Sequence, residues 1–89
     1  MLVDFSAEWC PPCLAMRHDV WPAPEVGRAV NASYVPLVID VDRNAPVADR
    51  YGVAGIPAVT ILDANGRVVR QSAGYLPASG VLRFLSEAR

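Results

Sequence analysis

Two cysteines three residues apart, Cys10 and Cys13, constrain the fold of this chain more than any other feature of its sequence. They are the only cysteines, and they follow a short apolar run at residues 1–7 that is typical of a strand covered on both faces. Pro11 and Pro12 lie between them, and proline is tolerated in the first turn of a helix, where its missing N–H has no intrahelical partner. The pattern predicts a strand, then a helix that begins near Pro11 with Cys10 at its N-cap.

Cysteines in this arrangement lie within the ~4.4–6.8 Å Cα separation that a disulfide accepts, so the bond could open and close with little backbone movement. A Cys10 thiolate at the positive end of the helix dipole would have its pKa lowered from ~8.5 into the range of ~3.5–7.5. Its sulfur could accept the N–H of Cys13, whereas Pro11 and Pro12 offer none and should limit this stabilisation. We expect Cys10 to be the exposed nucleophile. Cys13 should be the buried resolving thiol that attacks a mixed disulfide on Cys10.

Two other uses of the cysteine pair are weaker. A structural disulfide that closes so small a loop would contribute little through loop entropy. A metal site needs more ligands, and the single histidine, His18, lies roughly 140° round a helix from Cys13. A metal-binding CxxC module is therefore the non-enzymatic alternative, with no metal ligands assigned.

Composition restricts the partners. The net charge is −1, and the eight basic residues are all arginines dispersed along the chain, so nucleic acid and anionic membrane surfaces are not expected partners. No apolar run approaches the ~20 residues that span a bilayer, so direct membrane insertion of this segment is not expected. With 53% hydrophobic residues, residues 1–89 can form a single domain with a packed core. Because Met1 leads straight into the first strand, we expect that domain to be truncated or excised from a longer protein.

The rest of the chain predicts a mixed sheet with helices on its faces. The first helix should end before Pro22, and Pro24 can open a second one. A strand over 33–42 should pair in parallel with the first strand, since a helix connects them. A short helix and an antiparallel hairpin follow, with Asn65–Gly66 supplying positive φ angles in the turn, and an amphipathic helix begins after Pro77.

The segments VDFSAEWCPPC (3–13) and YGVAGIPAVTILDANGRV (51–68) resemble the thioredoxin fold and its active site, and the match covers essentially the whole chain. The resemblance implies a minimal thioredoxin-like α/β fold, a mixed four-stranded sheet flanked by helices that lacks the strand and helix opening a full thioredoxin. It also implies a dithiol–disulfide oxidoreductase with no cofactor beyond the Cys10–Cys13 disulfide. Ile56–Pro57 would be a cis peptide beside the cysteines, and the adjacent backbone would pair with the substrate as a strand does.

Asp4 matches the buried acid of thioredoxins. A carboxyl group in so apolar a run should have a raised pKa through desolvation, and it could exchange protons with Cys13. The lysine that thioredoxins usually carry near this acid is replaced by Val38. Trp9, Pro11, Pro12 and Ile56 are expected to form the surface that meets the substrate. Without the opening strand and helix, the strand around Val35–Val41 should be a sheet edge.

The break at Trp21–Pro22 looks most like the C-terminal thioredoxin-like domain of membrane thiol:disulfide interchange proteins of the DsbD type. In that family the domain receives electrons from a membrane-embedded cysteine pair and passes them to periplasmic acceptors. The resemblance therefore implies protein thiols and disulfides as partners, a membrane electron-donor domain and a periplasmic location as part of a membrane protein. The alternatives are a general thioredoxin, which would be cytoplasmic, and a thioredoxin of cytochrome c maturation, where the central Pro-Pro is familiar.

Overall fold

The computed structural model describes residues 1–88. Its elements, in chain order, are β1 (Leu2–Ser6), α1 (Pro11–Asp19), α2 (Pro24–Ser33), β2 (Pro36–Asp40), α3 (Ala45–Arg50), β3 (Ala58–Leu62), β4 (Val68–Ala73) and α4 (Ala78–Glu87). Among these 88 residues, no helix has both the length and the apolar character needed to cross a membrane.

The strands form one mixed sheet in the order β2–β1–β3–β4. β1 and β2 run parallel, with Asp4 opposite Val38, while β3 is antiparallel to both of its neighbours. A parallel pair needs a crossover connection, and the broken helix α1–α2 supplies it. The predicted thioredoxin-like architecture of a mixed four-stranded sheet flanked by helices is confirmed.

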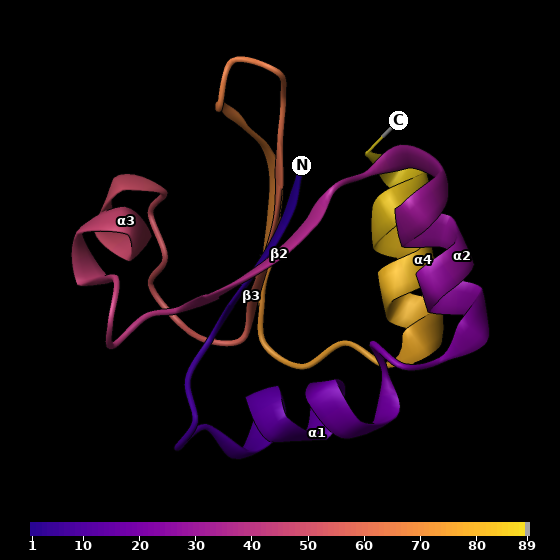
Figure 1. Cartoon of the computed structure of the whole chain (residues 1–89), viewed down its shortest axis with the longest axis horizontal. Helices are drawn as coiled ribbons and strands as arrows, with labels where there is room; N and C mark the ends of the chain where they lie inside the picture. The colour runs from indigo at the N-terminus through magenta and orange to yellow at the C-terminus, as the bar shows by residue number, and fades with distance from the viewer. Residues whose placement is uncertain (89) are drawn as a thin grey trace.

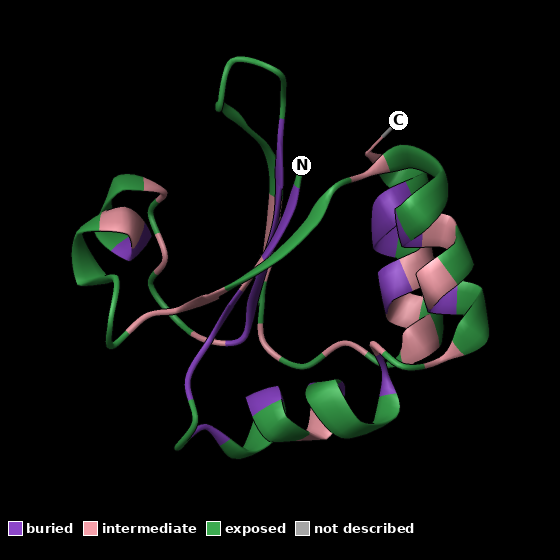
Figure 2. Ribbon diagram, viewed as in Figure 1, coloured by how far each residue is buried: buried purple, intermediate pink, exposed green. Residues whose placement is uncertain are grey.

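Side chains of β1 alternate between two apolar layers, one on each face of the sheet. Leu2 packs with side chains of α1, α2 and α4, whereas Val3 and Phe5 pack with Ala48 of α3. Figure 1 shows α2 and α4 side by side on one side of the sheet and α3 on the other. Burial is concentrated in β1 and β3, which are purple in Figure 2. Because both faces of β1 are covered, its sequence is a nearly continuous apolar run.

Proline interrupts the helical segment after the cysteines, as predicted. The N–H groups of Val20 and Trp21 both donate to the carbonyl oxygen of Met16, at 2.9 and 3.0 Å. Pro22 has no N–H to continue the pattern, and Pro24 then occupies the first turn of α2. The break packs Trp21 against the apolar layer formed by α1, α2 and α4.

The turn between β3 and β4 differs from the prediction in one torsion angle. Gly66 has a positive φ of 79°, but Asn65 does not, so the expectation that both residues supply positive φ angles is wrong. Asp63 explains the difference, because its Oδ1 accepts the N–H groups of Asn65 and Arg67 at 2.8 and 2.9 Å. These bonds hold a longer turn in which a single glycine adopts the left-handed conformation.

β2 is an edge strand of the sheet within residues 1–88, in agreement with the prediction. Val35, just before the strand, and Val38 within it are 66% and 60% exposed. Pro36 opens the strand at a position where a missing ladder donor is tolerated. The sheet therefore carries an exposed apolar edge next to β1.

We predict that Gly66→Ala destabilises the protein by about 1 kcal/mol, because residues with a side chain are strained at positive φ. The Tyr51 hydroxyl would lie 3.9 Å from an added Cβ, which is an ordinary contact, so the loss would come from the backbone. Gly27→Ala in α2 is the matched control. Outside the adjacent helix backbone, no atom of residues 1–88 lies within 4 Å of its added Cβ, and alanine should stabilise the helix by up to about 1 kcal/mol. Urea unfolding measures both variants, and a shift of the same sign in each would contradict the prediction.

Candidate active site

Cys10 is the N-cap residue of α1, and its Sγ accepts the backbone N–H of Cys13 at 3.3 Å. The two residues form a disulfide with their Cα atoms 5.2 Å apart, inside the expected range. Pro11 and Pro12 fill the first turn, so Cys13 supplies the N–H that reaches the sulfur. The predicted placement of the pair at the start of a helix is confirmed.

Cys10 is not exposed in this disulfide form. Its exposed fraction is 2% and that of Cys13 is 3%, so the expectation of an exposed Cys10 is wrong here. The bond turns each sulfur toward the other, and the pair packs with Ala7, Val41 and Ile56. The two cysteines still differ, because Cys10 lines a surface groove and Cys13 does not.

This groove has a volume of about 540 Å³ and runs between the cysteine motif and α3. Trp9, Pro11 and Pro12 line it beside Cys10, and Ile56 lines it from the segment that leads into β3. The structure therefore brings all four predicted substrate-facing residues together with Cys10. Mostly apolar walls beside a disulfide can accommodate a peptide segment that carries a sulfur of its own.

The Ile56–Pro57 peptide bond is cis, in agreement with the prediction. Pro57 is buried, and its carbonyl oxygen accepts the N–H of Gly74 at 2.7 Å. The next residue, Ala58, begins β3 and pairs with Phe5 of β1. The cis peptide therefore lies at the end of the sheet where β1 leads into the cysteine motif.

Trp9 is 66% exposed, but a hydrogen bond from its Nε1 to Asp42 Oδ2 at 2.6 Å holds its indole ring. Asp42 was not predicted from the sequence to belong to the site. Its position was nevertheless a usable signal, because Trp9 and Asp42 follow the parallel strands β1 and β2. The carboxyl ends of parallel strands meet at one edge of a sheet, where open α/β sheets place their ligands.

Asp4, in the middle of β1, does not line the groove with the cysteines but lines a separate pocket with Trp21. Burial raises the pKa of its carboxyl group from 3.8 to about 6, because the charged form loses its water. The Trp21 indole N–H and the charge of Arg17 oppose this rise in pKa. The predicted direction is therefore confirmed. No hydrogen bond joins Asp4 to either cysteine in the described part of the chain.

Among residues 1–88, no three side chains of His, Cys, Asp or Glu are grouped in a way that could hold a metal ion. His18 is exposed, and its Nδ1 lies 2.6 Å from Asp19 Oδ1. This hydrogen bond and the aspartate charge raise the pKa of His18. The histidine therefore takes part in a local surface interaction away from the groove.

A family model described as a thioredoxin-like domain matches residues 1–89. Thioredoxin from Chlorobaculum thiosulfatiphilum is 33% identical in an alignment of 89 positions that covers 98% of this chain and 77% of the relative. Thioredoxin from Bacillus subtilis (strain 168) is 32% identical over 87 residues, covering 98% and 80%. The reduced C-terminal domain of DsbD from Neisseria meningitidis superimposes with a TM-score of 0.84 at 26% identity, covering 100% of this chain and 80% of that domain. The oxidised form of that domain superimposes with a TM-score of 0.86 at 27% identity, covering 100% of this chain and 79% of the domain.

We predict that Asp4→Asn stabilises the oxidised protein above pH 6. The folded pKa of Asp4, about 6, lies above its ordinary 3.8. Between pH 3.8 and about 6, folding therefore takes up a proton. As pH rises through this range, the free energy of unfolding falls by roughly 2–3 kcal/mol. Asp4→Asn has no such loss, so its free energy of unfolding should exceed that of the parent by up to this amount at pH 8. At pH 4 the difference in stability should be nearly gone. Urea unfolding at both values measures it, and a difference independent of pH would refute the explanation.

We also predict that Pro12→Ala makes the disulfide easier to reduce. Pro12 holds the second helical position, whose N–H can reach an N-cap side chain, and alanine would restore that donor. A further hydrogen bond to a thiolate on Cys10 should shift the equilibrium with glutathione toward the dithiol by about tenfold, or about 1.4 kcal/mol. Pro11→Ala is the control, since an N–H at the first position does not serve the N-cap. Equal shifts in both variants would rule out this explanation.

Proposed function

Since the chain belongs to the thioredoxin-like family and is a thiol:disulfide oxidoreductase, we propose that Cys10 is its nucleophile and Cys13 its resolving thiol. The observation that carries this assignment is that Cys10 alone of the pair lines the groove. A protein that enters the groove meets the Cys10 sulfur, while Cys13 lies behind it in the first turn of α1.

The reaction runs in two exchanges. In the dithiol form, the Cys10 thiolate attacks a substrate disulfide, a Cys10–substrate bond forms, and one substrate sulfur leaves as a thiolate. Cys13 then loses its proton and attacks the Cys10 sulfur. The Cys10–Cys13 disulfide forms, the second substrate sulfur leaves, and two electrons have passed from the protein to the substrate.

Asp4 is proposed to accept the Cys13 proton, through water, during the second exchange. Its pKa of about 6 supports the role, because a base is most useful when its pKa lies near the working pH. Substrate backbone is proposed to pair with Ile56 beside the cis-Pro57. The rings of Trp9, Pro11 and Pro12 would provide apolar contacts along the groove.

We propose further that the domain belongs to the reductase branch typified by DsbD and is part of a longer membrane protein. Two observations support it: the likeness to the DsbD domain over the whole chain, and the helix broken at Trp21–Pro22. It would then accept electrons from a membrane-embedded cysteine pair and reduce periplasmic proteins. The relatives named thioredoxin favour the second candidate, a general thioredoxin. For that candidate we propose a cytoplasmic location.

The location of the full-length natural protein separates these candidates. A reductase of the DsbD type should sediment with membranes and expose this domain to protease added to the periplasm. A general thioredoxin should remain in the soluble cytoplasmic fraction, which would overturn the reductase assignment.

Cys10→Ser is predicted to abolish catalysed reduction of insulin disulfides by dithiothreitol, because no mixed disulfide can form. Cys13→Ser should instead accumulate mixed disulfides on Cys10, visible as an added mass that reductant removes. His18→Ala, which changes an exposed side chain outside the groove, is the control and should retain parental activity. Catalysis that survives in Cys10→Ser would contradict the assignment of the nucleophile.

A further inference from the structure

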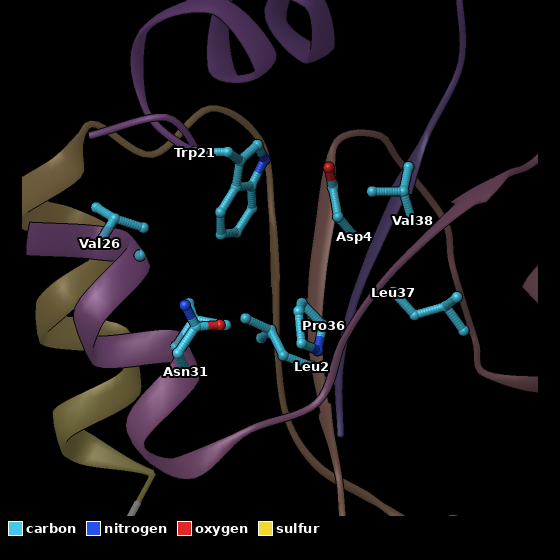
Figure 3. A pocket seen from close by; sticks show the side chains of 10 residues that line it. Leu2, Asp4, Trp21, Val26, Asn31, Pro36, Leu37 and Val38 are labelled. Carbon is cyan, nitrogen blue, oxygen red and sulfur yellow. The ribbon is translucent and has the colours of Figure 1, made fainter. Parts of the chain in front are cut away.

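Two buried polar atoms of opposite kind lack hydrogen-bond partners in the described chain. One is Asp4 Oδ1, an acceptor, and the other is Trp21 Nε1, a donor. Both residues line the same pocket of about 230 Å³ between α2 and strands β1 and β2. In Figure 3 the indole nitrogen of Trp21 is turned toward the Asp4 carboxyl group. An unpaired buried donor or acceptor costs about 1–3 kcal/mol, so the two groups have reason to pair with each other.

We infer that the Trp21 indole N–H binds the ionised Asp4 carboxylate across this pocket and thereby sets the pH range in which Asp4 can take a proton from Cys13. Trp21 is then a positioning residue, since it acts through Asp4 and does not touch the reacting sulfurs. This inference rests on the proton-transfer role proposed for Asp4.

The pocket around Trp21 offers its N–H few other hydrogen-bond acceptors. Most of the lining is apolar, and the other side chain there with an acceptor is Asn31, an exposed residue of α2. Figure 3 places Asn31 at the far end of the pocket from the indole nitrogen. A tryptophan that only filled the core would bury its N–H without a hydrogen bond. The orientation of the Trp21 N–H toward Asp4 therefore favours a polar role.

Few charges compete for Asp4. The residues paired with it on β2 and β3 are Val38 and Val59, and neither can be charged. From α1, Arg17 lowers the Asp4 pKa in the same direction as Trp21 but less strongly. The buried residues that α2 and α4 contribute to this apolar layer are uncharged: Val26, Val30, Val81, Phe84 and Leu85. Trp21 is therefore the main group that opposes desolvation of the carboxylate.

The break between α1 and α2 makes this contact possible. The N–H of Trp21 ends the α1 pattern on Met16, and Pro22 turns the chain away. The indole ring therefore lies over the middle of β1, where Asp4 is located. In an uninterrupted helix the residue at this position would continue along the helix axis.

Titration of the unmodified protein tests the pairing without any variant. The chain has two tryptophans, so its two indole N–H signals can be resolved by ¹H–¹⁵N NMR. The Trp21 signal should titrate with the same midpoint as the Asp4 carboxyl carbon, near pH 6. The Trp9 signal, whose N–H binds Asp42, is the internal control and should not follow that midpoint. A Trp21 signal that ignores the ionisation of Asp4 would overturn the inference.

Trp21→Phe keeps an aromatic ring in the pocket and removes the N–H donor together with part of the ring volume. The Asp4 pKa should rise by roughly half a unit or more, and the pH midpoint for resolution of the Cys10 mixed disulfide should rise with it. Tyr34→Phe is the matched control, because it removes the hydroxyl that donates to Leu85 O in the same layer and should leave both midpoints in place. In an Asp4→Asn background, Trp21→Phe should not change the pH profile.

The outcomes separate the two proposals. An Asp4 pKa that is unchanged in Trp21→Phe overturns this inference and leaves the exchange reaction on Cys10 untouched. An Asp4 pKa that rises while the pH profile of mixed-disulfide resolution stays fixed overturns the role of Asp4 itself, and the positioning role of Trp21 fails with it.

Discussion

Burial of β1 on both faces is the constraint on which the rest of the structure depends. One face carries Leu2 and Asp4 toward α1, α2 and α4, and the other carries Val3 and Phe5 toward α3. The strand is held between two partners in the sheet, so its last residue and the motif that follows have a defined position. The disulfide can be positioned by a nine-residue helix because the strand before it is part of the most buried layer of the molecule.

Prolines shape the site built on this strand. Pro11 and Pro12 start α1, and Pro12 withholds the N–H of the second helical position from the Cys10 sulfur, which leaves Cys13 as the backbone donor. Pro22 ends the helical segment and directs Trp21 toward Asp4. Pro57 brings its neighbour Ile56 to the groove beside Cys10. The helix start, the helix break and the backbone beside Pro57 each follow from a missing donor or a restricted backbone angle, so the sequence already indicates these three features.

Prediction from the sequence was successful for the order and pairing of the elements, and it failed where particular side-chain contacts decide the geometry. The parallel pairing, the break at Trp21–Pro22 and the cis bond at Pro57 follow from local patterns or from the resemblance. The prediction of a positive φ at Asn65 was wrong because the side chain of Asp63 reorganises the turn. The burial of Cys10, the hydrogen bond of Trp9 to Asp42 and the pocket that Trp21 shares with Asp4 depend on which side chains meet across elements. The spacing of residues along one element does not predict these contacts between elements.

Val38, the residue opposite Asp4 on β2, shows why these cross-fold contacts matter for chemistry. A positive charge beside a buried carboxylate favours ionisation strongly, and it would hold the pKa of Asp4 closer to its ordinary value. Here the strand opposite Asp4 supplies only an aliphatic side chain, so desolvation prevails and the pKa of Asp4 stays near 6. The neutral N–H of Trp21 and the charge of Arg17 oppose it only in part. A carboxyl group balanced in this way can change its protonation state near neutral pH, which an acid tightly paired with a lysine would do less readily.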